Sequence, residues 1–246
     1  MQISLAEFER TVSVDRFKRY RDMADNDHEA VCLYLWNLEL SQELYAVLSS
    51  LEIALRNTIH AAGTAHFGRD DWFREPLCVQ HFDNQQSMIN GAKYKYWENK
   101  IGKQAAKVQK NTLGWPPVGD HIAQLMFGFW GSLMNAPYEP LLWDPNKTPQ
   151  GPNLSQTAFP HASRANRKRA VIGPIVEELL KLRNRISHGE PILWWHPPVE
   201  AHYQNAIKVL SWISPAPASL LTFVDHFSTA YGQGHSNYDG LFTLVP

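Results

Sequence analysis

The chain has 246 residues, of which 44% are hydrophobic and 19% charged, which excludes a disordered tail and suffices for a hydrophobic core. Lys and Arg total 23 against 24 Asp and Glu, so any nucleic-acid contact must come from a local basic patch rather than a uniformly basic surface. The two cysteines, Cys32 and Cys78, exclude a disulfide framework and a four-thiolate zinc site. The chain opens with no signal-peptide pattern, and its most apolar stretch, residues 122–136, is too short to span a bilayer, so we expect a cytoplasmic protein without membrane partners.

The first half of the chain has the periodicity of helices. Residues 13–23 carry apolar side chains at helical spacing and are followed by Asn26, a residue type that favours helix N-termini. Residues 29–66 form an unusually long periodic run without proline, which predicts one long helix or two in sequence. We expect Gly68 to end this helix, because glycine readily adopts the conformation of a C-terminal turn.

The middle of the chain predicts three further helices around one irregular segment. Residues 84–110 are polar and Lys-rich, as expected of an exposed helix with a narrow apolar face. Residues 121–135 are apolar nearly all round and predict a buried central helix. Prolines and glycines punctuate residues 137–160, an irregular insertion of the kind that often carries function. Helix is expected again over residues 164–186, with a kink or break at Pro174.

A final amphipathic helix is expected over residues 200–213, followed by a short mixed tail. No strand pairs, internal repeats or low-complexity tracts are evident, so the pattern predicts an all-α fold. We expect one domain over residues 1–246, made of an N-terminal helical extension (1–26), a core bundle (27–213) and a C-terminal tail (214–246).

The most informative segment is residues 182–192, where two arginines, an amide and a histidine gather at a predicted helix end. On a helix, Asn184 and His188 share a face, whereas Arg183 is about 140° away from His188. Either the Arg183 side chain reaches round the helix, or His188 lies just past the last turn. Both arrangements place imidazole, guanidinium and amide groups around a space the size of a small anion.

These groups suit phosphodiester chemistry. A guanidinium matches phosphate oxygens with paired donors, and an imidazole transfers protons near neutral pH. RNA brings its own nucleophile, the 2′-hydroxyl, so neither a protein nucleophile nor a metal ion is needed if an arginine stabilises the transition state. From spacing alone a structural interpretation is the more common one, in which Arg183 and Arg185 complement the helix dipole and His188 caps the helix.

A second polar group lies on the long helix. Glu52, Arg56 and His60 follow one another at i, i+4 and i+8 on an otherwise apolar face, with Asn57 beside them. They form either a polar wall that orients the catalytic groups or a simple intrahelical ion pair. In both cases we expect Glu52 to pair with Arg56, because an unpaired carboxylate in the site would repel phosphate.

A third group is basic and lies in the helical region that leads to the arginine–histidine segment. It forms either an RNA-backbone patch or an ordinary solvated helix face. Its members are Arg164, Arg167, Lys168, Arg169 and Lys181. Beyond the segment, Trp194 and Trp195 either stack on unpaired bases or pack the loop onto the bundle. The eleven histidines show no His-Glu-x-x-His motif and no paired Cys/His spacing, so no metal site or cofactor is expected.

Five short motifs occur in a fixed order between residues 27 and 213. Arg183, Asn184 and His188 have the R-N-x-x-x-H form, within an L-R-N-R-hydrophobic-x-H-x-E-P-hydrophobic stretch over residues 182–192. The other motifs are Tyr34, Trp36 and Asn37; Leu-Glu-x-x-Leu-Arg-Asn over residues 51–57; Phe-Gly-Phe-Trp over residues 127–130; and Phe159 with Pro160. Together they resemble the Abi-like (abortive infection) family of the HEPN ribonuclease superfamily.

This resemblance implies an all-α, HEPN-like helical bundle with long central helices, often dimeric, whose active members cleave RNA without a metal ion. It implies His188 as general acid or base, Arg183 as the group that stabilises the transition state, and Asn184 as the residue that positions His188 or the phosphate. We therefore expect RNA as the substrate, a homodimer, an antitoxin or defence partner, and a role in phage defence or as a toxin. Gly189 departs from the family, which commonly has a second histidine there, and this implies reduced activity if that histidine contributes. The alternative is a non-catalytic module of the same type that binds RNA or a protein partner.

Overall fold

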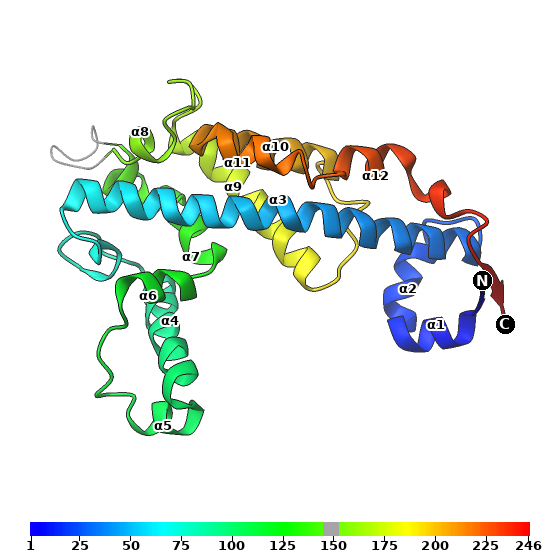
Figure 1. Cartoon of the computed structure of the whole chain (residues 1–246), viewed down its shortest axis with the longest axis horizontal. Coiled ribbons are helices and arrows are strands. Elements are labelled where there is room, and N and C mark those ends of the chain that lie inside the picture. Colours follow the sequence, from blue (N-terminus) through cyan, green and yellow to red (C-terminus); the bar gives the residue numbers. More distant parts are fainter. Residues whose placement is uncertain (145–152) are drawn as a thin grey trace. The chain divides into compact units, whose positions relative to one another are not determined.

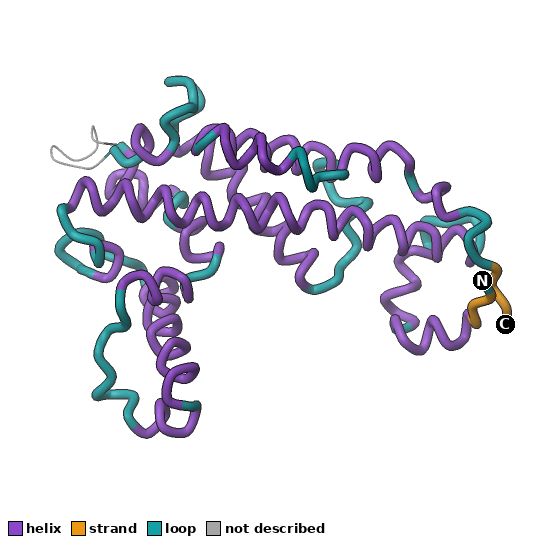
Figure 2. Tube along the Cα trace, in the orientation of Figure 1, coloured by secondary structure: helices purple, strands orange, loops and turns teal. Residues whose placement is uncertain are grey.

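The structure is a computed structural model, which describes residues 1–144 and 153–246 and is mostly helical (Figures 1 and 2). Helices account for 68% and strands for 3%, so the predicted all-α class is confirmed. The chain divides into two compact units, which we describe separately. The first unit comprises Met1–Ser49, Lys181–Ala206 and Ser219–Pro246, and the second unit comprises Ser50–Leu180 and Ile207–Ala218.

The helices in chain order vary widely in length. They are α1 (Leu5–Val12), α2 (Val14–Arg21), α3 (Asp27–Phe67), α4 (Asp83–Ile101), α5 (Lys103–Val108), α6 (Val118–Gln124), α7 (Phe127–Ser132), α8 (Ser155–Ala158), α9 (Arg169–Ser187), α10 (Val199–Ile213), α11 (Pro215–Leu221) and α12 (Phe227–Gln233). Short turns of 3-10 helix occur at Trp72–Arg74, Ala136–Tyr138 and His235–Tyr238, and a π-helical turn occurs at Glu139–Trp143. Of the predicted irregular insertion, residues 145–152 lie outside the described residues.

The long periodic run forms one continuous helix, α3, of 41 residues. Asn26 Oδ1 accepts the Glu29 N–H at 3.0 Å at its start, as the capping residue predicted. At its end Gly68 has a φ of 69° and its N–H donates to the Thr64 carbonyl at 3.0 Å, which confirms the predicted stop. The buried side chains along the helix include Leu40, Leu44, Val47, Leu48, Leu51, Leu55 and Ile59.

The two ends of the chain pair with each other in the first unit. β1 (Gln2–Ser4) and β2 (Thr243–Val245) form a short parallel pair, with Ile3 opposite Leu244. The expectation of no strand pairs is therefore wrong for the termini, because three residues are too few to produce a readable alternation. Beside the strands, Phe17 and Tyr20 of α2 are buried with side chains from the start of α3.

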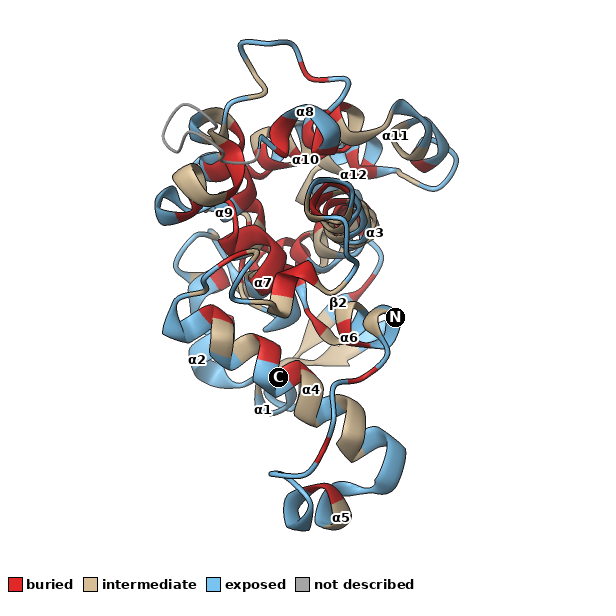
Figure 3. Ribbon diagram, turned by 90° about the vertical axis from the view of Figure 1, so that its left-hand side faces the viewer, coloured by how far each residue is buried: buried red, intermediate tan, exposed pale blue. Residues whose placement is uncertain are grey.

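The predicted helix over residues 121–135 is two short helices, α6 and α7, separated at Leu125 and Met126. The physical reason is a side chain from α3: Glu52 Oε1 accepts the Phe127 N–H at 2.9 Å and so begins a new helix there. The Trp130 indole also donates to the Leu125 carbonyl at 3.2 Å, a group that a continuous helix would use internally. The prediction of burial is confirmed for α7 (Figure 3).

The predicted helix over residues 164–186 begins later, at Arg169, and continues through Pro174 without a break. Residues 161–168 form turns instead, because Ser163 accepts the N–H groups of Asn166 and Arg167. The predicted helix over residues 84–110 likewise divides into α4 and α5 at Gly102. The helix expected over residues 200–213 is confirmed as α10, and the tail holds α11, α12 and β2.

None of the helices in the described parts of the chain combines the length and the apolar character needed to cross a bilayer.

Candidate functional site

The helix α9 ends in a Schellman turn with His188 just past its last residue. The Gly189 N–H donates to the Ile186 carbonyl at 3.0 Å, and the Glu190 N–H donates to the Arg185 carbonyl at 2.9 Å, which are the two hydrogen bonds of this motif. Gly189 has a φ of 61°, a conformation that costs most other residues about 1–2 kcal/mol. The glycine that departs from the family pattern is therefore the residue that this turn requires.

An arginine from α2 contacts the turn that ends α9. Arg16 Nη2 donates to the His188 carbonyl oxygen at 3.3 Å. A Cβ added at Gly189 would lie 3.1 Å from Arg16 Nη1, so the guanidinium uses space that only glycine leaves. The carbonyl groups at a helix C-terminus carry partial negative charge, which the guanidinium stabilises. In the first unit, α2 thus brings a guanidinium against the peptide that carries the candidate catalytic imidazole.

A cleft of about 440 Å³ surrounds this contact, a volume within the usual range for ligand sites. Its lining residues are Ser13, Asp15, Arg16, Arg19, His188, Glu190 and Pro191. The His188 residue is exposed, so its imidazole is accessible to a ligand. Of the two carboxylates, that of Glu190 is paired with Arg185 Nη1 at 3.0 Å. The cleft therefore presents the guanidiniums of Arg16 and Arg19 and the imidazole of His188. Against these groups stand the carboxylate of Asp15 and that of Glu190, which Arg185 already pairs.

The motif residues Arg183 and Asn184 lie on the last turns of α9. The Arg183 side chain is half-buried, and its Nη1 donates to Asn184 Oδ1 at 3.4 Å, so the amide helps to hold the guanidinium. Among the residues that the structure describes, neither of the two lines the cleft. The cleft brings His188 together with Arg16 and Arg19, and the predicted juxtaposition of Arg183 with His188 stays a prediction.

The neighbouring Arg185 holds the loop that follows the helix. Its Nη2 and Nε donate to the Pro191 carbonyl at 2.6 and 3.3 Å, and its guanidinium lies 5.4 Å from the centre of the Trp195 ring. The other face of the loop is packed as well, since Trp195 stacks on His202 and Trp194 meets Tyr20 edge-on. Trp194 and Trp195 therefore pack the loop, as one of their two predicted roles requires. Their other predicted role, stacking on unpaired bases, stays a prediction.

The polar group on α3 lies in the second unit and makes local contacts. Glu52 caps α7 through Phe127, and Arg56 Nε donates to Asn57 Oδ1 at 3.5 Å. His60 Nε2 donates to the Asp70 carbonyl at 2.7 Å, and its ring meets Trp130 edge-on. The contacts of Glu52 and His60 join α3 to later segments of the second unit, whereas that of Arg56 stays within α3. The roles of these residues in orienting a catalytic group, and the pairing of Glu52 with Arg56, stay predictions.

The predicted basic group does not lie on one helix. Arg164, Arg167 and Lys168 precede α9 in the turns, and Arg169 is its first residue. Arg167 donates to the carbonyls of Ala162 and Pro160, and Arg169 donates to the Met134 carbonyl at 3.3 Å and pairs with Glu139. These two arginines therefore stabilise the second unit, while Arg164 and Lys168 are exposed there and Lys181 is exposed in the first unit.

Sequence reasoning did not single out Arg16 and Arg19. Both belong to the short basic helix α2, and their i, i+3 spacing places them on one face. A basic helix face is a weak signal, because most such faces are simply solvated. Their connection to His188 depends on a contact between residues 172 positions apart.

Comparisons with family models, curated proteins and solved structures found no significant match to this chain. The HEPN and Abi-like assignment accordingly rests on the motifs alone.

Proposed function

We propose that this chain is a metal-independent endoribonuclease of the HEPN type, similar to the Abi-like family, that acts in phage defence or as a toxin. The observation that supports this most is the exposed His188 at the end of α9, in a cleft that it shares with Arg16 and Arg19. Cleavage of an RNA phosphodiester needs an accessible group that transfers protons, next to cationic side chains that bind the phosphate.

In the proposed reaction, the ribose 2′-hydroxyl attacks the adjacent phosphorus and the 5′-oxygen leaves. His188 takes the proton from the 2′-hydroxyl or gives one to the leaving oxygen. Arg183, which contacts Asn184, must turn toward His188 in this reaction to stabilise the charge on the phosphorane-like transition state. Arg16 and Arg19 bind neighbouring phosphates. The products are a 2′,3′-cyclic phosphate and a 5′-hydroxyl.

A homodimer fits this chemistry better than a monomer. One imidazole does not easily serve the attacking and the leaving oxygen at once, whereas a two-fold axis would bring two copies of His188 to one cleft. We therefore propose a two-fold dimer, with an antitoxin or defence partner controlling it in the cell.

A second candidate is RNA or protein binding without cleavage. The carboxylates of Asp15 and Glu190 line the same cleft as the arginines, and they oppose phosphate binding. Gly189 also stands where the family commonly has its second histidine. Salt-sensitive RNA binding without any product would favour this candidate.

The deciding experiment measures cleavage of total RNA in the presence of a chelator, with circular dichroism to verify that the chelated protein stays folded. His188→Ala should lower cleavage by about 10²–10⁴-fold, and Arg183→Ala by about 10²–10³-fold. His161→Ala is the matched control, because His161 is also exposed but lies in the second unit. If folded His188→Ala cleaves RNA at the wild-type rate, the proposed mechanism is wrong.

A further inference from the structure

Three side chains that bind metal ions converge at the start of α3. His28 and Cys32 lie one helical turn apart on α3, and Asp239 comes from the C-terminal segment that leads to β2. The Cys32 sulfur lies 3.7 Å from His28 Nδ1 and 3.6 Å from Asp239 Oδ1, and these nitrogen and oxygen atoms are 3.9 Å apart. All three residues belong to the first unit.

These separations are those of ligands around one tetrahedral ion. Bonds of about 2.3 Å to sulfur and about 2.0–2.2 Å to nitrogen and oxygen place neighbouring ligand atoms about 3.3–3.7 Å apart at the tetrahedral angle. The two distances from the Cys32 sulfur, 3.6 and 3.7 Å, fall in this range, and the 3.9 Å between His28 and Asp239 exceeds it slightly. The ligand atoms thus form a nearly equilateral triangle that needs only a small contraction to bind an ion.

The surroundings of His28 prepare its free nitrogen for this role. His28 Nε2 lies 3.4 Å from the Phe242 carbonyl oxygen, and its ring stacks on the Phe242 ring at 4.6 Å. Because a carbonyl only accepts hydrogen bonds, Nε2 is the donor in this contact, and Nδ1 is the nitrogen that faces Cys32 and Asp239. A metal-bound histidine is held in this way by a second hydrogen bond from its other nitrogen.

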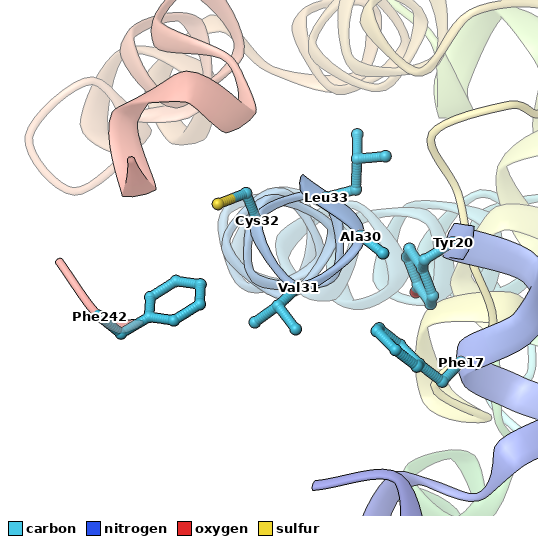
Figure 4. Close-up of a cluster of buried hydrophobic side chains, with 7 residues drawn as sticks. All are labelled: Phe17, Tyr20, Ala30, Val31, Cys32, Leu33 and Phe242. Atoms are coloured by element: carbon cyan, nitrogen blue, oxygen red, sulfur yellow. The ribbon is translucent and has the colours of Figure 1, made fainter. Parts of the chain in front are cut away.

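The Cys32 thiol is buried but points toward the other two ligands. Figure 4 shows its sulfur on the side of α3 opposite Phe17 and Tyr20, the side where Phe242 lies. A thiol gives up its proton when it binds a metal ion, so Cys32 would coordinate as the thiolate. The side chains of His28 and Asp239 are 35% and 62% exposed, so the cluster is accessible to an ion and to water.

We propose that His28, Cys32 and Asp239 bind one Zn²⁺ ion, with water as the fourth ligand. A set of one imidazole nitrogen, one thiolate and one carboxylate oxygen suits zinc better than magnesium or calcium, which prefer oxygen ligands. The ion fastens the C-terminal segment to α3 and so supports the pairing of β2 with β1. The His28-x-x-x-Cys32 spacing is the one local sequence signal of this site, since Asp239 lies 207 residues after Cys32.

The test uses the full chain and reads metal binding directly, so it is independent of RNA cleavage. Titration with Co²⁺ should produce a thiolate charge-transfer band that saturates at one equivalent and that Zn²⁺ removes. Asp239→Asn should weaken Zn²⁺ binding at least tenfold, and Cys32→Ser should abolish the band. Cys78→Ser, at the other free cysteine, should leave the Zn²⁺ affinity and the Co²⁺ band unchanged. Zn²⁺ should raise the midpoint of thermal unfolding equally in the wild type and in Cys78→Ser, less in Asp239→Asn, and not in Cys32→Ser.

Cys32 is buried, so Cys32→Ser can prevent folding. Asp239 is exposed, so Asp239→Asn should fold and still tests the site. A Co²⁺ spectrum without a thiolate band overturns the proposal. So does equal Zn²⁺ affinity of wild-type and folded Asp239→Asn protein, because adventitious surface binding would not depend on this carboxylate.

Discussion

Arg16 donates a hydrogen bond from Nη2 to the carbonyl oxygen of His188 at 3.3 Å and so joins α2 to the C-terminus of α9. This contact places a guanidinium at the mouth of the cleft in which the candidate catalytic imidazole is exposed. It also connects two parts of the first unit that are 172 residues apart in sequence.

Arg16→Ala should weaken RNA binding and cleavage more than Arg10→Ala, which removes a positive charge outside the cleft. The substitution removes both a phosphate ligand and the contact with the His188 peptide, so we expect the salt dependence of RNA binding to fall by about one phosphate contact. Arg10→Ala is the matched control, since Arg10 is an exposed arginine of α1 that does not line the cleft. Equal RNA affinity of the two variants would contradict a role for Arg16 in the cleft.

Gly189→Ala should destabilise the protein by about 1–2 kcal/mol through its left-handed backbone, and by a further amount because Arg16 must move. Gly68→Ala isolates the first effect, because Gly68 has a similar φ of 69° and no atom within 4 Å of the added Cβ. Urea denaturation of both variants, repeated in an Arg16→Ala background, measures the difference. We expect the additional loss at Gly189 to disappear in that background; if it persists, Arg16 is not its cause.

Glu52→Ala should destabilise the protein by about 1 kcal/mol, because α7 loses the carboxylate that accepts the Phe127 N–H. Glu52→Gln keeps an acceptor oxygen and should lose much less. Chemical denaturation measures both changes, and RNA cleavage by the folded variants shows whether Glu52 also orients catalytic groups. Equal stability of Glu52→Ala and the wild type would mean that the hydrogen bond from Phe127 to Glu52 does not contribute to the free energy of unfolding.

Stability should fall as the pH drops from about 6.5 toward 4, because His121 is buried in its neutral form. Burial lowers the pKa of His121 to about 4, whereas the unfolded chain has a pKa near 6.5. Between these two pKa values the unfolded state binds a proton that the folded state does not. The free energy of unfolding therefore falls by about 3 kcal/mol as the pH drops from above 6.5 to about 4. Burial also lowers the pKa of His81, which adds to the same trend.

His121→Phe should flatten this pH dependence, although it loses the hydrogen bond from Nε2 to the Ile89 carbonyl. The exposed His161 provides the control, since His161→Phe should keep the wild-type slope. Thermal unfolding midpoints between pH 4 and 7 give the comparison. An unchanged slope in His121→Phe would show that other groups control the acid sensitivity.

The sequence by itself determined the elements that depend on local interactions. The helical character of α3 follows from leucines at helical spacing, and its two ends follow from Asn26 and Gly68. The sequence left open whether this run forms one helix or two. The end of α9 beside His188 follows in the same way from Gly189, because capping hydrogen bonds join residues only a few positions apart. These features need no knowledge of the rest of the chain.

Only the tertiary structure decided which distant side chains meet. The separation of α6 from α7 depends on Glu52, 75 residues before the amide that it caps. The contact of Arg16 with His188, and that of Asp239 with Cys32, span 172 and 207 residues. Such pairs leave no periodic trace in a single sequence, because they arise when packing of apolar faces brings separate segments together. The candidate cleft and the proposed zinc site both consist of such pairs.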